Sequence, residues 1–512
     1  MSNLSTFVKR IRDIMRNDAG INGDAQRIEQ LVWMLFLKVY DAKEEDWELL
    51  GDYESIVPEE CRWGNWASAK NKYTGKDNKL TGEKLLKFVN EVLFPVLKGE
   101  NASWEGKTIP GVVVTPETPR KNAMVRTIFE DANNYMKDGV LMKQVLGVID
   151  ELDFTSYEET HAFGEIYEGI LRELQSSGSS GEFYTPRAVT EFMAKMIEPK
   201  IGEKMADFAC GTGGFITSWL NELEKKVGSS TKNRELWGTS VYGMEKKQFP
   251  YMLCMTNLLF RDLEEPRVDH GNSLGKKLLD YTERDAFDVV LMNPPYGGNE
   301  KNDVKTNFPP DVASSETADL FMSLIMRRLK KTGRAAVILP DGFLFGTDNA
   351  KVAIKKNLYK DFNLHTVIRL PQSVFSPYTS ITTNILFFDH KGPTKETWFY
   401  RLDMPEGYKH FSKTKPIQLA HLTPAVEWWK KREEIAVDGF DKAKKYTAAE
   451  IAERSYNLDL CGYPHEEEEI LPPKDLIREY QEKRASLNAD IDRILAQITD
   501  ILGIDMDGEN EQ

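Results

Sequence analysis

The chain has 512 residues, 41% hydrophobic and 29% charged, which is the composition of a globular protein with roughly two to four domains. No apolar stretch reaches the ~18 residues that a membrane helix needs, and four scattered cysteines without a CxxC pair argue against a metal site and for a reducing, cytoplasmic location. The net charge of −14 argues against a protein that binds DNA unaided. The DNA contacts would come from a local basic patch or, as we favour, from another subunit.

Residues 1–150 are predicted to form a helical N-terminal domain, because apolar residues recur at helical spacing in stretches such as Ile28–Val39. Glu105–Thr108 resembles a phosphate-binding loop only superficially. Asn101 stands where such a loop needs glycine, and no apolar strand precedes it, so we reject ATP binding there. A further helix is expected from His161 to Gln175, before a Gly-Ser run that is typical of a flexible loop.

Residues 151–462 are predicted to form an α/β domain. Short β-rich apolar runs alternate there with helical segments, which is typical of a parallel sheet with helices on both faces. Because the last two runs are close in sequence, they could pair antiparallel. The expected strands are Lys204–Ala209, Leu236–Met244, Phe287–Met292, Arg334–Leu339, Leu364–Leu370, Thr383–Phe388 and Trp398–Leu402.

Residues 463–512 are predicted to form a helical tail for subunit association. Pro472 and Pro473 can start a helix, and the apolar residues after them fall on one stripe. That stripe needs a partner, which is either the rest of this chain or another subunit. Its members are Leu476, Tyr480, Leu487, Ile491, Ile494, Ile498 and Ile501.

Polar groups and glycines follow three successive strands. Gly211, Gly213 and Gly214 come directly after the first strand, where glycine lets the backbone approach a ligand closely, although a plain structural turn would also account for them. Their order is not GxGxxG, which disfavours a nicotinamide site. Glu245 ends the next strand and can accept both hydroxyls of a ribose, or simply lie on the surface. Asn272 follows a further, short possible strand that comes before Phe287–Met292, and a polar side chain there can meet an adenine ring edge.

The most informative motif follows the buried strand Phe287–Met292 and reads Asn293, Pro294, Pro295 and Tyr296. The two prolines stiffen the turn and have no N–H to donate. The side-chain oxygen of Asn293 and the backbone oxygen of Pro294 can therefore face one amine together, while Tyr296 offers a ring for stacking a base. A purely structural turn would not need this combination.

This arrangement suits methylation of an exocyclic amine. The amine of adenine is a poor nucleophile, because its lone pair is delocalised into the ring. Two acceptors on its hydrogens favour a pyramidal nitrogen and stabilise the positive charge that develops as it attacks a methyl group. The base must leave the duplex to reach such a pocket, so base flipping is implied.

These motifs, in this order, resemble the amino-methylating DNA methyltransferases that use S-adenosylmethionine, and more narrowly the modification subunits of type I restriction-modification systems. The marker for the subfamily is the run from Gly181 to Arg187, in which Glu182 stands where such subunits commonly carry glutamine. Phe208 likewise stands where proline is usual. The resemblance implies a Rossmann-like methyltransferase sheet with a helical N-terminal domain and a helical tail.

The resemblance also implies the roles of individual residues. Asn293, Pro294, Pro295 and Tyr296 would be catalytic, Tyr296 and Phe375 would hold the target base, and Tyr378–Asn384 would help to shape its pocket. No metal is implied. The cofactor residues would be Glu182, Phe183, Tyr184, Thr185, Pro186, Arg187, Asp207, Gly211, Thr212, Gly213, Gly214, Phe215, Glu245, Asn272 and Ser273.

In systems of this kind a separate specificity subunit reads the DNA, and two modification subunits join one specificity subunit. The implied partners are therefore duplex DNA, that subunit and, where present, a restriction subunit with motor activity. This implication agrees with the acidic charge and with the apolar stripe of the tail.

We therefore predict N6 methylation of adenine by S-adenosylmethionine. Methylation of N4 of cytosine remains an alternative that uses the same geometry, although Asn293 favours adenine. Methylation of a protein glutamine or of an RNA amine is a second alternative. A third is a scaffold that binds the cofactor without catalysis, which the intact motif disfavours.

Overall fold

The computed structural model describes residues 2–51, 53–72, 74–152, 167, 184–263, 265–376, 378–412, 414–463 and 473–502. It consists of two compact units, Met1–Gly462 and Tyr463–Gln512. Glu182, Phe183 and the expected Gly-Ser loop lie outside the described residues, as does the helix expected at His161–Gln175 except for Tyr167. The domain boundaries expected at residues 150 and 462 stay predictions.

Helices make up most of the first 150 residues. The longest is α2, which buries an aromatic core that includes Trp33 and Phe36. Glu105 and Gly106 form the turn of a hairpin, both with positive φ, in the segment that resembles a phosphate loop. The elements are α1 (Ser2–Met15), α2 (Gly23–Leu49), α3 (Trp63–Trp66), α4 (Gly82–Phe88), α5 (Phe94–Leu97), β1 (Ala102–Trp104), β2 (Lys107–Ile109), α6 (Arg120–Phe129) and α7 (Gly139–Asp150).

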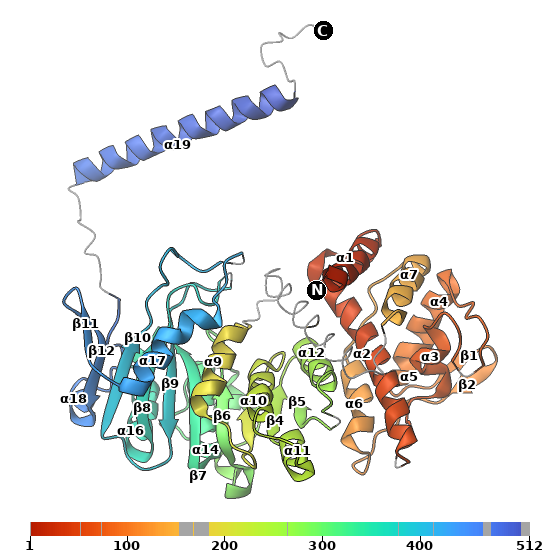
Figure 1. Ribbon diagram of the computed structural model, residues 1–512, viewed down its shortest axis with the longest axis horizontal. Helices are drawn as coiled ribbons and strands as arrows, with labels where there is room; N and C mark the ends of the chain where they lie inside the picture. Colours follow the sequence, from red (N-terminus) through yellow and green to blue (C-terminus); the bar gives the residue numbers. More distant parts are fainter. Residues whose placement is uncertain are drawn as a thin grey trace. The chain divides into compact units, whose positions relative to one another are not determined.

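A ten-stranded mixed sheet forms the centre of the following region (Figure 1). Its strand order is β11-β12-β10-β8-β9-β7-β6-β3-β4-β5. The strands are β3 (Met205–Asp207), β4 (Val241–Glu245), β5 (Val268–His270), β6 (Phe287–Met292), β7 (Leu329–Pro340), β8 (Asn363–Arg369), β9 (Thr383–Asp389), β10 (Glu396–Arg401), β11 (Ile435–Val437) and β12 (Phe440–Thr447).

Helices cover both faces of this sheet, as the sequence predicts. Successive residues of β6 alternate between two cores, with Val289 and Leu291 in one and Val290 and Met292 in the other. The helices on the first face are α9 (Arg187–Ile197), α10 (Gly214–Glu224), α11 (Thr231–Gly238), α12 (Gln248–Leu259) and α17 (Thr423–Lys431). Those on the second are α14 (Thr317–Arg328), α15 (Asp341–Phe345), α16 (Asn349–Asp361) and α18 (Ala448–Glu453), and a short α13 (Asn302–Lys305) precedes α14.

The structure corrects the expectation that Thr383–Phe388 pairs with Trp398–Leu402. The strand β9 lies between β7 and β8 and is antiparallel to both, so each of its edges is occupied. The strand β10 instead pairs parallel with β8 and antiparallel with β12. The expected strand Leu236–Met244 is also too long, because α11 continues to Gly238. The sheet is consequently mixed rather than wholly parallel.

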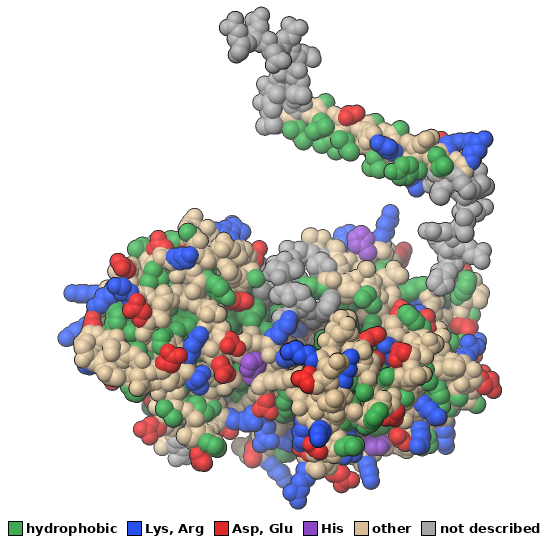
Figure 2. Space-filling view, turned by 180° about the vertical axis from the view of Figure 1, so that it is seen from behind, with side chains coloured by type: hydrophobic (Ala, Val, Ile, Leu, Met, Phe, Trp, Pro, Cys, Tyr) green, Lys and Arg blue, Asp and Glu red, His purple; other side chains and the backbone are tan. Residues whose placement is uncertain are grey.

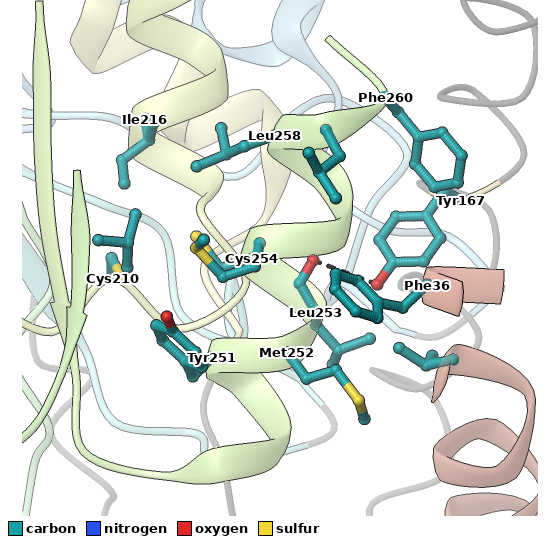
Figure 3. Close-up of a cluster of buried hydrophobic side chains, with 14 of the residues drawn as sticks. Phe36, Tyr167, Cys210, Ile216, Tyr251, Met252, Leu253, Cys254, Leu258 and Phe260 are labelled. Atoms are coloured by element: carbon teal, nitrogen blue, oxygen red, sulfur yellow. Dashed lines mark hydrogen bonds between the residues drawn. The ribbon is translucent and has the colours of Figure 1, made fainter. Parts of the chain in front are cut away.

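The N-terminal helices share a core with one face of the sheet. Helix α12 packs against α2, and Phe36 of α2 belongs to the same apolar cluster as Leu253 of α12 (Figure 3). The hydroxyl of Tyr167 donates to the carbonyl oxygen of Leu253 at 3.1 Å. Polar contacts add to this packing, since Gln248 Nε2 donates to the carbonyl oxygen of Thr127 at 2.7 Å.

The second unit contains one long helix, α19 (Pro473–Leu502), at the position predicted for the tail. Hydrophobic side chains gather along one side of α19 (Figure 2). Tyr480, Leu487 and Ile491, all members of the predicted stripe, are exposed. Among the described residues, no helix combines the length and the apolar composition that crossing a bilayer requires.

Candidate functional site

The order of the strands defines where the candidate site lies. From β3 the chain runs outward through β4 and β5, then returns to β6 on the other side of β3. Ligands of open α/β sheets bind at such a reversal, in the crevice beyond the carboxyl ends of the strands. Gly211 follows β3 and Asn293 follows β6, so the glycine motif and the Asn-Pro-Pro-Tyr motif meet at this crevice.

A small pocket lies at the crevice. Asn293 lines it together with Gly211, Thr212 and Gly214, as expected for a ligand placed between the two motifs. The remaining lining residues are Tyr184, Thr185, Arg187, Thr190, Asp207, Ala209, Cys210 and Phe215.

The glycine turn has a conformation and a close contact that both require glycine. Gly213 begins α10 with φ of 81°, in the left-handed region. A Cβ atom at Gly213 would lie 2.8 Å from Sγ of Cys254 on α12. Cys254 and Cys210 lie side by side behind the turn (Figure 3). Helix α12 therefore supports the turn from behind.

Two carboxyl groups border the glycine turn. Glu245, at the end of β4, accepts from the backbone N–H of Gly211 at 2.9 Å and from that of Lys247 at 2.8 Å. Asp207, at the end of β3, is 1% exposed and accepts from the N–H of Ala209 at 3.2 Å. Burial, with Glu245 nearby, raises the pKa of Asp207 to about 8. Glu245 is thus the carboxylate that fixes the turn, while Asp207 tolerates a proton near neutral pH.

Asn293 is held on both sides of its amide. Its Nδ2 donates to Oγ1 of Thr185 at 2.9 Å, and its Oδ1 accepts from the hydroxyl of Tyr296. Burial raises the pKa of Tyr296 well above its usual value, so this hydroxyl keeps the proton that it donates. Because Nδ2 is occupied by Thr185, the carbonyl oxygen of the amide is directed away from Thr185.

Two pairs of aromatic rings lie at this part of the fold. The rings of Tyr296 and Phe375 meet edge to face, with centroids 6.4 Å apart and an interplanar angle of 84°. Tyr184 and Tyr378 form a second pair, also with centroids 6.4 Å apart. Tyr184 lines the pocket. The prediction that Tyr296 and Phe375 hold a base stays a prediction.

Some predicted residues lie at the periphery of the pocket. Ser273 directs its hydroxyl to the carbonyl oxygen of Phe208 at 2.6 Å, so it joins the loop after β5 to the end of β3. Asn272 accepts from the N–H of Leu274 at 3.0 Å. Pro186 precedes α9, where a proline fits the first helical turn. Pro294 is buried, whereas Pro295 is exposed.

Two further residues arrange the edge of the sheet beside the site, and neither is in the predicted set. Arg369, at the end of β8, donates to Asp341 Oδ1 at 2.8 Å and to Asn384 Oδ1 at 3.1 Å. Thr317, at the start of α14, donates its hydroxyl to the carbonyl oxygen of Gly298 at 2.7 Å. Both contacts join residues that are distant in sequence, so no local pattern indicates them.

The arrangement as a whole suits transfer of a small group between two ligands. A backbone turn with a carboxylate can hold the polar part of a cofactor in the pocket. The Asn293 amide and the adjacent aromatic rings can hold an amine on a flat base at the same place. Among the described residues, no group of three or more His, Cys, Asp and Glu side chains could hold a metal ion.

Two family profiles match the sequence. N-6 DNA methylase matches residues 158–470, and the HsdM N-terminal domain matches residues 4–149. The chain is 43% identical over 510 residues to the methylase subunit of the type I restriction enzyme EcoEI from Escherichia coli, covering 99% of both proteins.

Solved structures give the same result. A candidate modification subunit of a type I restriction enzyme from Vibrio vulnificus YJ016 is 37% identical, with a TM-score of 0.74, over 88% of this chain and 93% of that one. A chain from a type I R-M system, solved to explain complex assembly and conformational transition, is 31% identical with a TM-score of 0.77. That match covers 97% of this chain and 98% of the solved one.

Proposed function

We infer the function of the chain from its family, because it belongs to the N-6 DNA methylase family and is an adenine-specific methyltransferase subunit of the type I restriction-enzyme kind. In this proposal, the pocket at the carboxyl ends of β3 and β6 is where a methyl group passes from S-adenosylmethionine to N6 of a flipped adenine. The observation that carries this proposal is the position of Asn293, which lines the same pocket as the glycine turn. The amide oxygen that would accept from the amine and the glycine turn that would bind the cofactor therefore lie next to each other.

The residues around the pocket fit the cofactor. Gly211 and Gly213 both have positive φ, so the turn leaves room where side chains would otherwise stand. Glu245, at the end of β4, accepts from the N–H of Gly211 and would also accept the ribose hydroxyls. When bound, S-adenosylmethionine supplies an electrophilic methyl group.

The chain's own residues would then prepare the amine. Asn293 Oδ1 and the backbone oxygen of Pro294 accept the two hydrogens of N6, which favours the pyramidal nitrogen and stabilises the developing positive charge. Thr185 keeps the amide of Asn293 in the orientation that presents its oxygen. Tyr296 and Phe375 hold the ring of the base, so the nitrogen is positioned before reaction.

The proposal includes partners. The exposed stripe of α19 would join a helix of a specificity subunit, which selects the DNA sequence in the cytoplasmic complex. Two copies of this chain would flank one specificity subunit, and a restriction subunit would complete a nuclease. The acidic net charge of −14 supports a division in which the partner supplies much of the DNA contact.

The test compares the assembled complex with its Asn293→Ala variant on duplex DNA and labelled cofactor. We expect label in N6-methyladenine for the unaltered complex and a fall of about 10²-fold or more for the variant, since it removes one preorganised contact. Cofactor affinity should survive in the variant. Label in N4-methylcytosine, or undiminished activity of Asn293→Ala, would overturn the assignment.

A further inference from the structure

We propose that Ile381 enters the base stack of the DNA duplex and fills the space that the flipped adenine leaves. This inference rests on the proposed function, because it concerns the DNA from which that adenine comes. It assigns a positioning role to a residue that does not touch the reacting atoms.

Ile381 is an apolar side chain that the fold leaves outside its cores. It is 49% exposed, whereas Val374 and Phe375 in the same loop are buried. Its sequence neighbours Ser380 and Thr382 are polar, so Ile381 is the apolar residue of this stretch. One exposed isoleucine needs no explanation by itself. Its place in the fold supplies the reason to assign it a role.

The loop that carries Ile381 lies at the reactive edge of the sheet. It joins the carboxyl end of β8 to the start of β9. Because β9 is antiparallel, its start lies at the edge where β6 delivers Asn293. The same loop provides Phe375, whose ring meets that of Tyr296. One short loop therefore carries both a ring that would hold the extruded base and an apolar side chain outside the pocket.

The loop is braced on several sides, as a wedge requires. The backbone N–H of Ile381 donates to Thr379 Oγ1 at 3.0 Å, and the carbonyl oxygen of Thr382 accepts from the N–H of Asp341 at 3.1 Å. At the other end of the loop, Ser373 Oγ accepts from the N–H of Phe411 at 2.8 Å.

Bracing matters because a loop whose backbone is already ordered loses little conformational entropy when it meets the DNA. Isoleucine is also branched at Cβ, which limits its rotation about χ1.

An aliphatic wedge suits a subunit that does not itself read the sequence. Extruding a base costs a few kcal/mol of stacking and pairing, and an inserted apolar side chain can recover part of that cost. An aliphatic group makes no directional hydrogen bond, so it would accept any neighbouring base pair. The alternative role for an exposed isoleucine, contact with the specificity subunit, predicts a loss of assembly instead.

The test uses the assembled full-length complex on a duplex that contains its target sequence, identified from the N6-methyladenines that the complex leaves in plasmid DNA. The variant is Ile381→Ala, and Ile381→Leu keeps an apolar group of similar volume. Val437→Ala is the matched control, because Val437 is also branched at Cβ and exposed, on the β11–β12 hairpin. Two-aminopurine at the target position reports flipping by its fluorescence.

We expect Ile381→Ala to lower kcat/KM on the paired duplex by roughly tenfold and to reduce the two-aminopurine signal, since the cost of flipping is no longer offset. On a duplex with a mismatch at the target adenine the loss should shrink to less than about twofold, because that base is already weakly stacked. Ile381→Leu and Val437→Ala should behave like the unaltered complex.

The inference is overturned if Ile381→Ala methylates the paired duplex normally, while the proposed function would then stand. It is also overturned if the loss persists on the mismatched duplex, or if the variant dissociates from the specificity subunit. Failure of the unaltered complex to form N6-methyladenine would instead refute the proposed function, and the inference with it.

Discussion

Replacing Thr185 by valine removes one hydrogen bond and keeps the shape of the side chain. Thr185 Oγ1 accepts from Nδ2 of Asn293 at 2.9 Å, and this contact sets the orientation of the amide. Thr185→Val leaves the hydroxyl of Tyr296 to hold the amide without Thr185, so the amide can turn more readily and present its NH₂ group in place of its oxygen to the target amine. Thr185→Ser keeps the hydroxyl and serves as the control.

The size of the effect follows from two contributions. A neutral hydrogen bond contributes about 1 kcal/mol, which corresponds to roughly fivefold in rate. Misplacement of the reacting groups by about 1 Å can cost ~10²-fold. We therefore expect Thr185→Val to lower kcat by between about fivefold and about 100-fold. Thr185→Ser should stay close to the unaltered protein.

The assay measures kcat on duplex DNA and cofactor affinity by calorimetry, in the same assembled complex. If Thr185 acts through Asn293, the cofactor Kd should change by less than about twofold, because the contact that is lost does not involve the cofactor. A normal kcat together with a large rise in the cofactor Kd would refute this reasoning. It would show that Thr185 serves the cofactor directly, as the sequence resemblance implies.

Four other variants test separate parts of the molecule. Glu245→Gln removes the charge of the carboxylate that fixes the glycine turn, and calorimetry should show a cofactor Kd raised roughly tenfold; an unchanged Kd would exclude the ribose role. Gly213→Ala introduces strain at a φ of 81° and a clash with Cys254, which should cost about 1–3 kcal/mol in thermal unfolding. Adding Cys254→Ala should restore only the steric share, and equal melting temperatures for all three proteins would contradict the geometry. Burial raises the pKa of Glu44 from 4.5 to about 7. Between these two pH values the native state keeps a proton that the unfolded chain loses. The free energy of unfolding should therefore fall as pH rises through that range and then level off. Glu44→Gln should lack this fall, which amounts to at most about 3 kcal/mol. The measurement is the melting temperature between about pH 5 and about pH 8, and the same dependence on pH in both proteins would contradict the prediction. Truncation after Pro473 should weaken assembly with the specificity subunit and leave cofactor affinity unchanged; intact assembly would argue that the tail has another role.

The sequence predicts the parts of the fold that are encoded locally. The strand Phe287–Met292 occurs with the predicted bounds, because a continuous apolar run before a Pro-Pro turn leaves the chain few alternatives. The tail helix likewise begins at Pro473. The α/β class with a helical N-terminal part is confirmed for the same reason, since it depends on the alternation of local patterns.

Pairings between distant segments were beyond the reach of local patterns. The strand β9 looks in sequence like a partner of β10, yet its neighbours are β7 and β8. Thr185 and Asn293 are 108 positions apart, and each has a motif that suggests a role of its own rather than a bond between them. The catalytic and cofactor roles assigned to individual residues stay predictions, which the variants above address.

Helix α12 touches the glycine turn through Cys254 and the N-terminal helices through its packing on α2. Helix α12 thus has Phe36 of α2 on one side and presents its own Cys254 on the other (Figure 3). A tilt of the N-terminal helices that carried α12 along would move Cys254 relative to Gly213, where the space holds no more than a glycine. Movement of the N-terminal helices during assembly would in that way change the shape of the cofactor pocket.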